Sequence, residues 1–216
     1  MAKLADALND PVTTTVDLIR HGEPAGGEMY RGTKDDPLSE LGWSQMRDAT
    51  QAAIGWDHIV TSPLLRCREF ATELSQQRNI PLTVADGFRE ICFGVWEGQR
   101  PAELNAQDPQ QVLKFWLDPV VNSPRGAEPF PEFAGRIQQA WQALLADYAG
   151  QHILLVCHGG VIRSVLTGMM GQPIENTFRW HVPYAAVSRV RIYTEQGGSH
   201  HGRQVPTLVF HAGQLE

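Results

Sequence analysis

Two apolar segments of this chain are each followed by a histidine with a glycine next to it. Residues Thr13–Ile19 are mostly β-branched and apolar, which predicts a buried strand, and His21 comes shortly after this segment. Residues His152–Cys157 form the most apolar predicted strand of the chain, and His158 follows directly. Strands buried on both faces are typical of parallel sheets, whose ligands bind beyond the carboxyl ends of the strands. We therefore expect the two histidines to meet at one edge of a sheet.

Strand-like and helix-like segments alternate along the remainder of the chain. The further predicted strands are His58–Thr61, Leu82–Ala85, Ala186–Tyr193 and Thr207–Phe210. The predicted helices run from Ser39 to about Ile54, from Ser62 to about Gln77, from Glu132 to about Tyr148 and from His158 to about Met170. This alternation predicts a three-layer α/β/α sandwich with a mostly parallel central sheet. The segment 101–130 is rich in proline and is expected to form a lid of short helices and loops.

Length and composition limit the class of protein. A chain of 216 residues is expected to form a single domain over residues 1–216. Because 42% of the residues are hydrophobic and 19% are charged, extensive disorder is excluded, and no apolar run approaches the roughly 20 residues of a membrane helix. The formal net charge of −6 argues against a nucleic-acid partner, and three cysteines are too few for a disulfide framework. Since Met1–Pro11 also lacks the apolar core of a secretory signal, a cytoplasmic protein is expected.

His21 has the surroundings of a nucleophile that attacks a bound phosphate ester. It follows Arg20, whose planar guanidinium can bind two phosphate oxygens at once, and Gly22 allows a ligand to approach closely. On this hypothesis an imidazole nitrogen of His21 forms a bond to phosphorus. The alternative is a histidine that only caps the end of a strand, and this short segment alone does not exclude it.

A second group of candidates surrounds His158. The backbone amides of Gly159 and Gly160 open the next helix and are expected to form an anion site beside this histidine. Arg66 lies near the start of a helix that follows another strand, from which its side chain can reach the same edge of the sheet. Each residue has an ordinary structural explanation, but two histidines at two strand ends of one sheet favour a shared site.

Glu90 is the candidate general acid. It stands in a loop together with Phe88, Phe93 and Trp96. A carboxyl group among aromatic rings would have its protonated form favoured, because burial penalises the charged form, and it could then protonate a leaving alkoxide. The alternative is an exposed loop glutamate beside a tryptophan of the core.

These motifs resemble, in their order and spacing, those of the histidine phosphatase superfamily, which is the phosphoglycerate mutase-like branch of phosphatases. The matching motifs are Arg20-His21-Gly22, Ser62-Pro63-Leu64 with Arg66, Glu90 before Phe93-Gly94-x-Trp96-Glu97-Gly98, and Val156-Cys157-His158-Gly159-Gly160. Within the superfamily the chain is most similar to the alpha-ribazole phosphatases of cobalamin synthesis. The features that carry this similarity are His21-Gly22-Glu23-Pro24, the segment 36–45 and Arg125-Gly126-Ala127-Glu128.

The resemblance implies a metal-independent phosphomonoester hydrolase without a cofactor, acting on a small phosphorylated metabolite such as alpha-ribazole 5′-phosphate. It implies that a phosphohistidine forms and is then hydrolysed, with a carboxyl group serving first as acid and then as base. The implied catalytic residues are His21, Glu90 and His158, and the implied phosphate-binding residues are Arg20, Arg66 and Gly159. A phosphoglycerate mutase-type isomerase and a non-catalytic module that binds phosphorylated ligands stay open as alternatives, and so does the oligomeric state, including a homodimer.

One segment departs from the pattern of the superfamily. Many members place a small hydroxyl residue and an asparagine shortly after the first histidine, both in contact with phosphate. The corresponding places hold Glu23, Pro24 and Gly27 in this chain. Arg31, Thr33 or Lys34 are the candidates to replace these contacts.

The segment from Cys157 to Arg163 also fits C-x5-R, the pattern of cysteine-dependent phosphatases. A thiolate at a helix N-terminus beside an arginine would be a plausible nucleophile. This interpretation leaves His21 and Glu90 without a role, and Cys157 continues an apolar run in which a buried thiol is ordinary. We therefore favour the histidine as nucleophile.

Three other histidines raise the question of a metal site. His200 and His201 lie in a glycine-rich loop, where a solvated turn is favoured over metal ligation. His181, next to Trp180, is a candidate for the rim of the site. No metal is expected at these positions.

Overall fold

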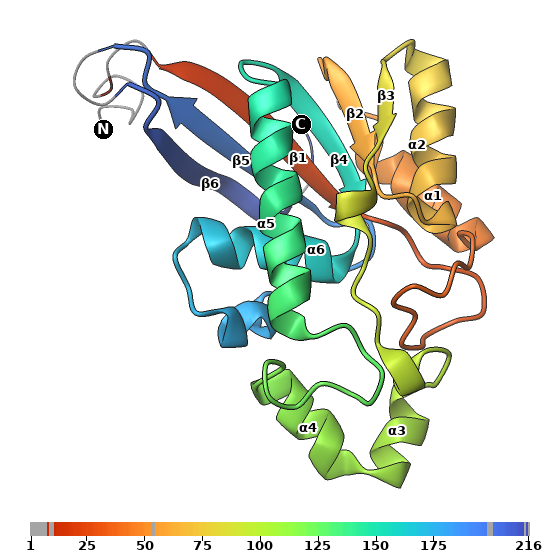
Figure 1. The fold of residues 1–216 in the computed structure, drawn as a ribbon. Coiled ribbons are helices and arrows are strands. Elements are labelled where there is room, and N and C mark those ends of the chain that lie inside the picture. Colours follow the sequence, from red (N-terminus) through yellow and green to blue (C-terminus); the bar gives the residue numbers. More distant parts are fainter. Residues whose placement is uncertain (1–7, 9–10, 53–54, 198–200, 214, 216) are drawn as a thin grey trace.

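The computed structural model describes residues 8, 11–52, 55–197, 201–213 and 215. Its centre is a six-stranded sheet in the order β3-β2-β4-β1-β5-β6 (Figure 1). The strands are β1 (Val12–Arg20), β2 (His58–Thr61), β3 (Leu82–Val84), β4 (His152–Cys157), β5 (Val187–Thr194) and β6 (Gln204–Gly213). β1 pairs in parallel with β4, β4 with β2, and β2 with β3. β5 is antiparallel to its neighbours β1 and β6. The sheet is therefore mostly parallel, as predicted, and the carboxyl ends of β1 and β4 lie side by side.

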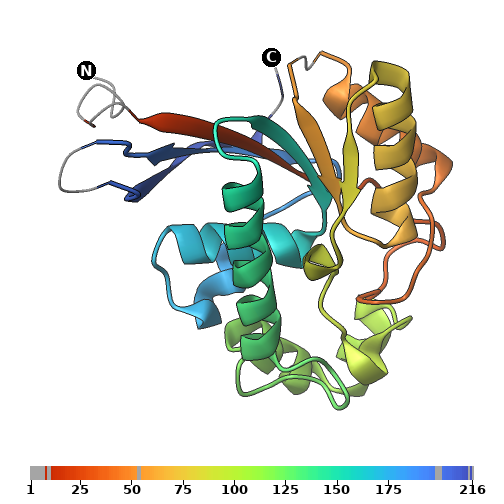
Figure 2. The same ribbon diagram turned by 45° about the horizontal axis from the view of Figure 1, so that its top comes forward.

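Helices cover both faces of this sheet (Figures 1 and 2). α1 (Glu40–Thr50) and α2 (Leu65–Arg78) pack on one face, and α5 (Phe130–Asp147) and α6 (Gly159–Met169) pack on the other. The predicted three-layer α/β/α sandwich is confirmed. Within the described ranges, no helix has the length and apolar character that crossing a membrane requires.

The side chains of β4 alternate between two hydrophobic cores, because successive residues of a strand point to opposite faces of the sheet. Ile153 and Leu155 pack with α5 and α6, and Leu154 and Val156 pack with α1 and α2. All four side chains are completely buried. Burial on both faces is the physical reason why this segment is so apolar in the sequence.

α2 begins at Leu65 rather than at the predicted Ser62. The Ser62 N–H donates to the carbonyl of Val156 at 3.0 Å, so the chain is still bonded to the sheet at this point. Arg66 is consequently the second residue of α2 and lies in its first turn, close to the strand ends.

Other boundaries also differ from the prediction, most of them by one residue, and three elements show the larger or more informative differences. α1 ends at Thr50, and the predicted end at Ile54 lies outside the described residues. α5 begins at Phe130 rather than at Glu132. β6 has 10 residues where four were predicted, because it pairs with β5 along most of the length of that strand.

The segment 101–130 contains α3 (Pro101–Gln107) and α4 (Pro109–Leu117), which lie beyond the carboxyl ends of the parallel strands (Figure 1). Phe115 of α4 packs with Tyr30 and Trp96 in a third hydrophobic core. Since Tyr30 belongs to the loop after β1, this core joins the segment to the chain that follows His21.

A buried ion pair lies in the middle of β1. Asp17 is completely buried, and its carboxylate accepts hydrogen bonds from Nε and Nη2 of Arg189 on β5, at 2.7 and 2.9 Å. The same carboxylate accepts from Trp56 Nε1 at 2.8 Å and from His152 Nε2 on β4 at 2.9 Å. Burial alone would raise the pKa of Asp17, but the hydrogen bonds from these donors outweigh it, and the pKa lies below its usual value. The network ties β1 to both neighbouring strands.

Candidate active site

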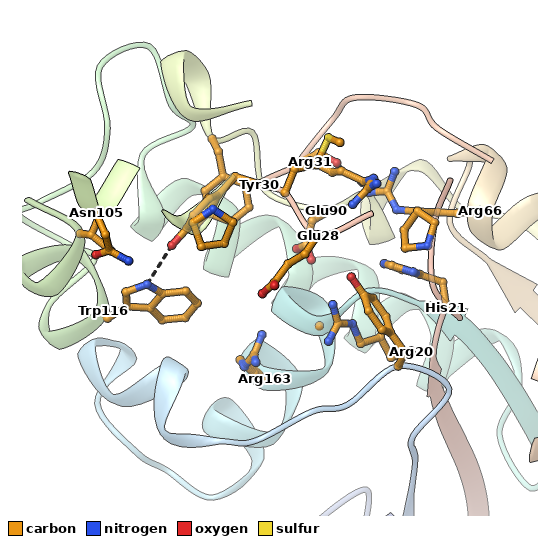
Figure 3. Close-up of a pocket in the computed structure, with 18 residues that line it drawn as sticks. Arg20, His21, Glu28, Tyr30, Arg31, Arg66, Glu90, Asn105, Trp116 and Arg163 are labelled. Atoms are coloured by element: carbon orange, nitrogen blue, oxygen red, sulfur yellow. Dashed lines mark hydrogen bonds between the residues drawn. The ribbon is translucent and has the colours of Figure 1, made fainter. Parts of the chain in front are cut away.

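A cavity of about 350 Å³ lies at the carboxyl ends of β1 and β4 (Figure 3). Charged side chains that include Arg20 and Arg66 lie around His21 at one end, and aromatic side chains line the other end. The rings of His21 and His158 stand edge to face with their centroids 5.2 Å apart. The two strand ends therefore meet, as the sequence predicted.

His21 is held in one tautomer by a backbone hydrogen bond. Its Nδ1 donates to the Gly22 carbonyl at 2.7 Å, because a carbonyl can only accept, and Nε2 therefore carries the lone pair. The imidazole points into the cavity (Figure 3). Residue 22 must be glycine, because a Cβ there would collide with the backbone of Gly42. The arrangement leaves Nε2 available as a nucleophile.

The surroundings of His21 keep its imidazole neutral. Burial lowers its pKa well below the usual value of about 6.5, and the positive charges of Arg66 and Arg20 lower it further. A histidine with a lowered pKa takes up its proton only when the pH falls below that pKa. We therefore expect His21 to be unprotonated at about pH 6.5 and above.

An NMR titration of the imidazole signals of the free protein, with His21→Ala used to assign the His21 signal, checks this expectation. A His21 signal that titrates at or above about pH 6.5 would contradict it.

Arg20 and Arg66 line the cavity, and each uses only part of its guanidinium within the protein. Arg20 donates from Nη1 to the Val182 carbonyl at 2.7 Å, and its guanidinium lies 4.1 Å from the centroid of the Tyr184 ring. Arg66, which is 1% exposed, donates from Nη1 and Nη2 to two carbonyls of the loop 32–34. Among the described residues, the Nε groups of both arginines lack a hydrogen-bond partner. Each Nη group that donates to a carbonyl has a second N–H, so both arginines also keep N–H groups for an anion in the cavity.

His158 lies behind His21 rather than on the cavity wall. It is completely buried, and its Nε2 lies 2.6 Å from Ser62 Oγ. Burial lowers its pKa well below the usual value, and the charge of Arg66 adds to the effect. The resemblance implied contact with phosphoryl oxygens, whereas here the ring faces Ser62 and the ring of His21.

Glu90 lines the cavity and is held by two backbone amides. Its Oε1 accepts from the Ile91 N–H and its Oε2 accepts from the Gly160 N–H, both at 3.0 Å. The expectation that the Gly160 amide is free for an anion is wrong, because the carboxylate of Glu90 occupies it. A Cβ on residue 160 would displace this carboxylate, so glycine at this position lets Glu90 approach the amide.

The predicted aromatic surroundings of Glu90 are present only in part. Phe93 lines the same cavity, but Phe88 packs in the core beside α5 and Trp96 packs in the core beside α4. The loop that carries these residues passes between two cores, so its aromatic side chains diverge.

Of the three residues expected to replace missing phosphate contacts, only Arg31 lines the cavity. Its Nη2 donates to two carbonyls of the loop 25–27, both at 2.6 Å, and its Nε pairs with a nearby aspartate at 3.1 Å. Thr33 instead donates to Glu97, and Lys34 is exposed and pairs with the same aspartate. Thr33 and Lys34 do not line the cavity.

The loop after His21 is fixed by the N-terminus of α1. Ser39 Oγ donates to Glu23 Oε1 at 3.0 Å, and the Glu23 N–H donates to Gln45 Oε1 at 2.8 Å. Pro24 lines the cavity, whereas Gly27 accepts from Arg31. Glu23 is therefore used in the structure of the loop.

The cavity also contains residues that were not predicted as site residues. Arg163 on α6 donates from Nε to a backbone carbonyl at 2.9 Å, and burial lowers its pKa to about 10. No sequence motif of the histidine hypothesis included it. The unpredicted residues of the cavity that bear on function are Glu28, Tyr30, Asn105, Trp116, Arg163 and Tyr184.

The geometry does not support a cysteine nucleophile. Cys157 is completely buried in the core beside α5 and α6 and does not line the cavity. Burial raises the pKa of its thiol well above the usual value, which disfavours the thiolate.

Neither His181 nor His201 lines the cavity. His181 is exposed, and His201 donates from Nδ1 to the Gln196 carbonyl at 2.7 Å in a turn. His200 lies outside the described residues. Within the part of the chain that the structure describes, no three His, Cys, Asp or Glu side chains are grouped in a way that could hold a metal ion.

Comparison with known proteins identifies the family. The model of the histidine phosphatase superfamily (branch 1) matches residues 16–202. The chain belongs to the histidine phosphatase superfamily. Several relatives of this superfamily enzyme are named as phosphatases, including the adenosylcobalamin/alpha-ribazole phosphatase of Escherichia coli, which is 26% identical over 179 residues (81% of this chain and 88% of the relative).

Other members of the superfamily that resemble this chain carry different names. The 2,3-bisphosphoglycerate-dependent phosphoglycerate mutase of Rhizobium etli is 28% identical over 197 residues, which are 84% of this chain and 92% of the relative. The structure of a mycobacterial glucosyl-3-phosphoglycerate phosphatase superposes with a TM-score of 0.81 at 22% identity and covers 94% of this chain and 100% of its own. At 22% identity the structural similarity establishes the fold alone. The relatives carry different names, so they do not identify the substrate.

Proposed function

We propose that this protein is a metal-independent phosphomonoester hydrolase that acts through a phosphohistidine. His21 Nε2 attacks phosphorus, the bond between phosphorus and the ester oxygen breaks, and protonated Glu90 gives its proton to the leaving alkoxide. Water then attacks phosphorus, the Glu90 carboxylate takes up a proton from it, and the bond between phosphorus and nitrogen breaks. The products are an alcohol, inorganic phosphate and the neutral imidazole of His21.

The tautomer of His21 is the observation that supports this mechanism best. The Gly22 carbonyl holds the proton on Nδ1, so the lone pair of Nε2 faces the cavity in which Arg20 and Arg66 keep unused N–H groups. When phosphorus bonds to Nε2 the ring becomes positive, and the same carbonyl stabilises it. The guanidinium groups offset the charge of the phosphoryl group during transfer.

The other predicted site residues have supporting roles in this proposal. Gly159 lines the cavity and opens the 11-residue helix α6, so we propose that its N–H binds a phosphoryl oxygen. We propose that His158 exchanges its contact with Ser62 for a phosphoryl oxygen when substrate binds.

We propose alpha-ribazole 5′-phosphate as the substrate and the segment 101–130 as the lid that selects the leaving group. The name of the Escherichia coli relative supports the substrate, and the position of α3 and α4 at the cavity supports the lid. Incubation with alpha-ribazole 5′-phosphate or with 3-phosphoglycerate, followed by ³¹P NMR, tests the reaction type. Release of inorganic phosphate is expected. Conversion of 3-phosphoglycerate into its 2-phospho isomer would show a mutase instead.

Replacement of Glu90 by glutamine is expected to affect the two chemical steps differently. For an alkyl phosphate, kcat should fall by about 10²–10⁴-fold, because the leaving alkoxide is no longer protonated. For p-nitrophenyl phosphate, whose leaving group needs no proton, the first step should persist. Phosphohistidine should then accumulate, because the water that hydrolyses it lacks its base.

Quench-flow measurement of protein-bound phosphate checks this expectation. Glu132→Gln, an exposed glutamate on α5, is the control and should behave like the unmodified protein. An equal loss on both esters without accumulated phosphohistidine would contradict the role of Glu90.

A further inference from the structure

Tyr184 lines the cavity beside the proposed nucleophile. The centroid of its ring lies 5.8 Å from that of the His21 ring, and the Arg20 guanidinium lies 4.1 Å from the centroid of the Tyr184 ring. The side chain is half-buried. The mechanism proposed above gives it no role, although it contacts both the group that would attack phosphorus and a group that would bind the phosphoryl oxygens.

The backbone that carries Tyr184 is bonded to the backbone at the end of β1. The Ala185 N–H donates to the His21 carbonyl at 3.3 Å, and the Arg20 N–H donates to the Ala186 carbonyl at 3.1 Å. Ala185 has a φ of 54°, in the left-handed region that residues other than glycine adopt infrequently, and such a conformation persists where the surrounding structure holds it. The turn therefore fixes the backbone of Tyr184 next to His21.

The Tyr184 hydroxyl has a hydrogen to donate. Burial lowers the pKa of Arg20, and the Tyr184 side chain opposes this effect through an electrostatic contact with the guanidinium. Because a guanidinium carries donors alone, the phenol oxygen is the acceptor in this contact. Among the residues that the structure describes, no hydrogen bond donated by the Tyr184 hydroxyl is found. Its hydrogen is therefore available to an acceptor that binds beside Arg20.

Hydroxyl groups are scarce around the proposed phosphate position. Of the described residues that line the cavity, only Tyr30 and Tyr184 carry one. Tyr30 Oη accepts from Trp116 Nε1 at 2.9 Å, at the end of the cavity away from His21 (Figure 3). The residues 23–27, which follow shortly after His21, include no serine, threonine or tyrosine. Tyr184 is thus the lining residue that can offer a hydroxyl next to His21.

We propose that Tyr184 is a further catalytic residue, whose hydroxyl donates a hydrogen bond to an oxygen of the phosphoryl group. Its ring holds the Arg20 guanidinium toward the same group. The contact is made to the group that is transferred rather than to the leaving group, so it acts equally on every phosphate ester and on inorganic phosphate. This inference rests on the hydrolase function proposed above and adds a residue to it.

Binding of inorganic phosphate tests the contact without any need for turnover. Tyr184→Phe keeps the ring and removes only the hydroxyl. Isothermal titration calorimetry should show a Kd for inorganic phosphate that is higher by about tenfold or more, the usual effect of removing a hydrogen bond to a charged group. Tyr193→Phe, at a half-buried tyrosine of β5 that does not line the cavity, is the matched control and should leave the Kd unchanged.

Kinetics with two esters locate the contact on the transferred group. For p-nitrophenyl phosphate and for ribose 5-phosphate, Tyr184→Phe should lower kcat/KM by the same factor, again about tenfold or more. Glu90→Gln, in contrast, is expected to affect an alkyl ester and p-nitrophenyl phosphate unequally. Tyr184→Leu should lose more than Tyr184→Phe on both esters, because the Arg20 guanidinium also loses the ring on which it lies.

A phosphate affinity of Tyr184→Phe equal to that of Tyr193→Phe would overturn the proposed contact and leave the hydrolase function standing. A loss of kcat/KM confined to one of the two esters would overturn it as well, because the hydroxyl would then act on the leaving group. If no ester released phosphate while Tyr184→Phe still weakened phosphate binding, the hydrolase function would fail and the contact would stand.

Discussion

Replacement of His21 by alanine is expected to lower kcat for ester hydrolysis by at least about 10⁴-fold, because it removes the atom that bonds to phosphorus. Arg20 and Arg66 remain in the variant, so KM should change far less than kcat. The rate of phosphate release measures the loss. A ³²P-labelled ester, quenched in the steady state, should label the unmodified protein through a bond that is stable in alkali and labile in acid, as expected of a phosphohistidine.

His181→Ala provides the matched control, because His181 is exposed and does not line the cavity. It should keep both full activity and the label. The mechanism would be wrong if His21→Ala kept activity close to that of the control. It would also be wrong if the label were found on Cys157.

Replacement of Asp17 by alanine is expected to lower the free energy of unfolding by about 3–5 kcal/mol at neutral pH, the usual cost of removing one partner of a buried ion pair. The variant leaves the Arg189 guanidinium and the Trp56 N–H without the carboxylate that accepts from them. Urea denaturation followed by circular dichroism measures the change. Asp48→Ala, at an exposed position of α1, is the control and should alter the free energy of unfolding by less than about 0.5 kcal/mol.

The ion pair of Asp17 and Arg189 also makes the free energy of unfolding depend on pH, and the sign of this dependence follows from the pKa of Asp17. The pKa of Asp17 is lowered in the folded protein, so its stabilisation is complete above the unfolded value of about 3.9 and is lost as the pH falls from there through the folded pKa. The difference in stability between the unmodified protein and Asp17→Asn, a variant of similar shape, should therefore narrow below about pH 4. A difference that stays constant into acid would contradict the pairing.

The sequence predicted most of the fold because burial leaves a clear pattern. β2 and β4 have the predicted limits, since each is an apolar run between polar residues. The start of α2 could not be predicted, because Ser62-Pro63 has the composition of a helix start. The hydrogen bond from Ser62 to Val156 that prevents a helix there joins residues far apart in the chain.

The proximity of His21 and His158 was predictable because each residue follows a strand and the two strands pair in parallel. Glu28, Trp116 and Tyr184 come from loops and short helices, and they reach the cavity only through contacts between distant segments. The prediction that the Gly160 amide is free to bind an anion was wrong for the same reason. Its acceptor, Glu90, is 70 residues away in the sequence.

Part of the cavity lining lies outside the central layers of the fold. His21, the proposed nucleophile, lies at the end of a core strand, whereas Trp116 and Asn105 lie on helices outside the central layers. A new substrate range could therefore arise by exchanging α3 and α4 alone, without rebuilding the reacting groups. For protein engineering, this makes a library confined to these two helices a direct route to phosphatases of altered selectivity.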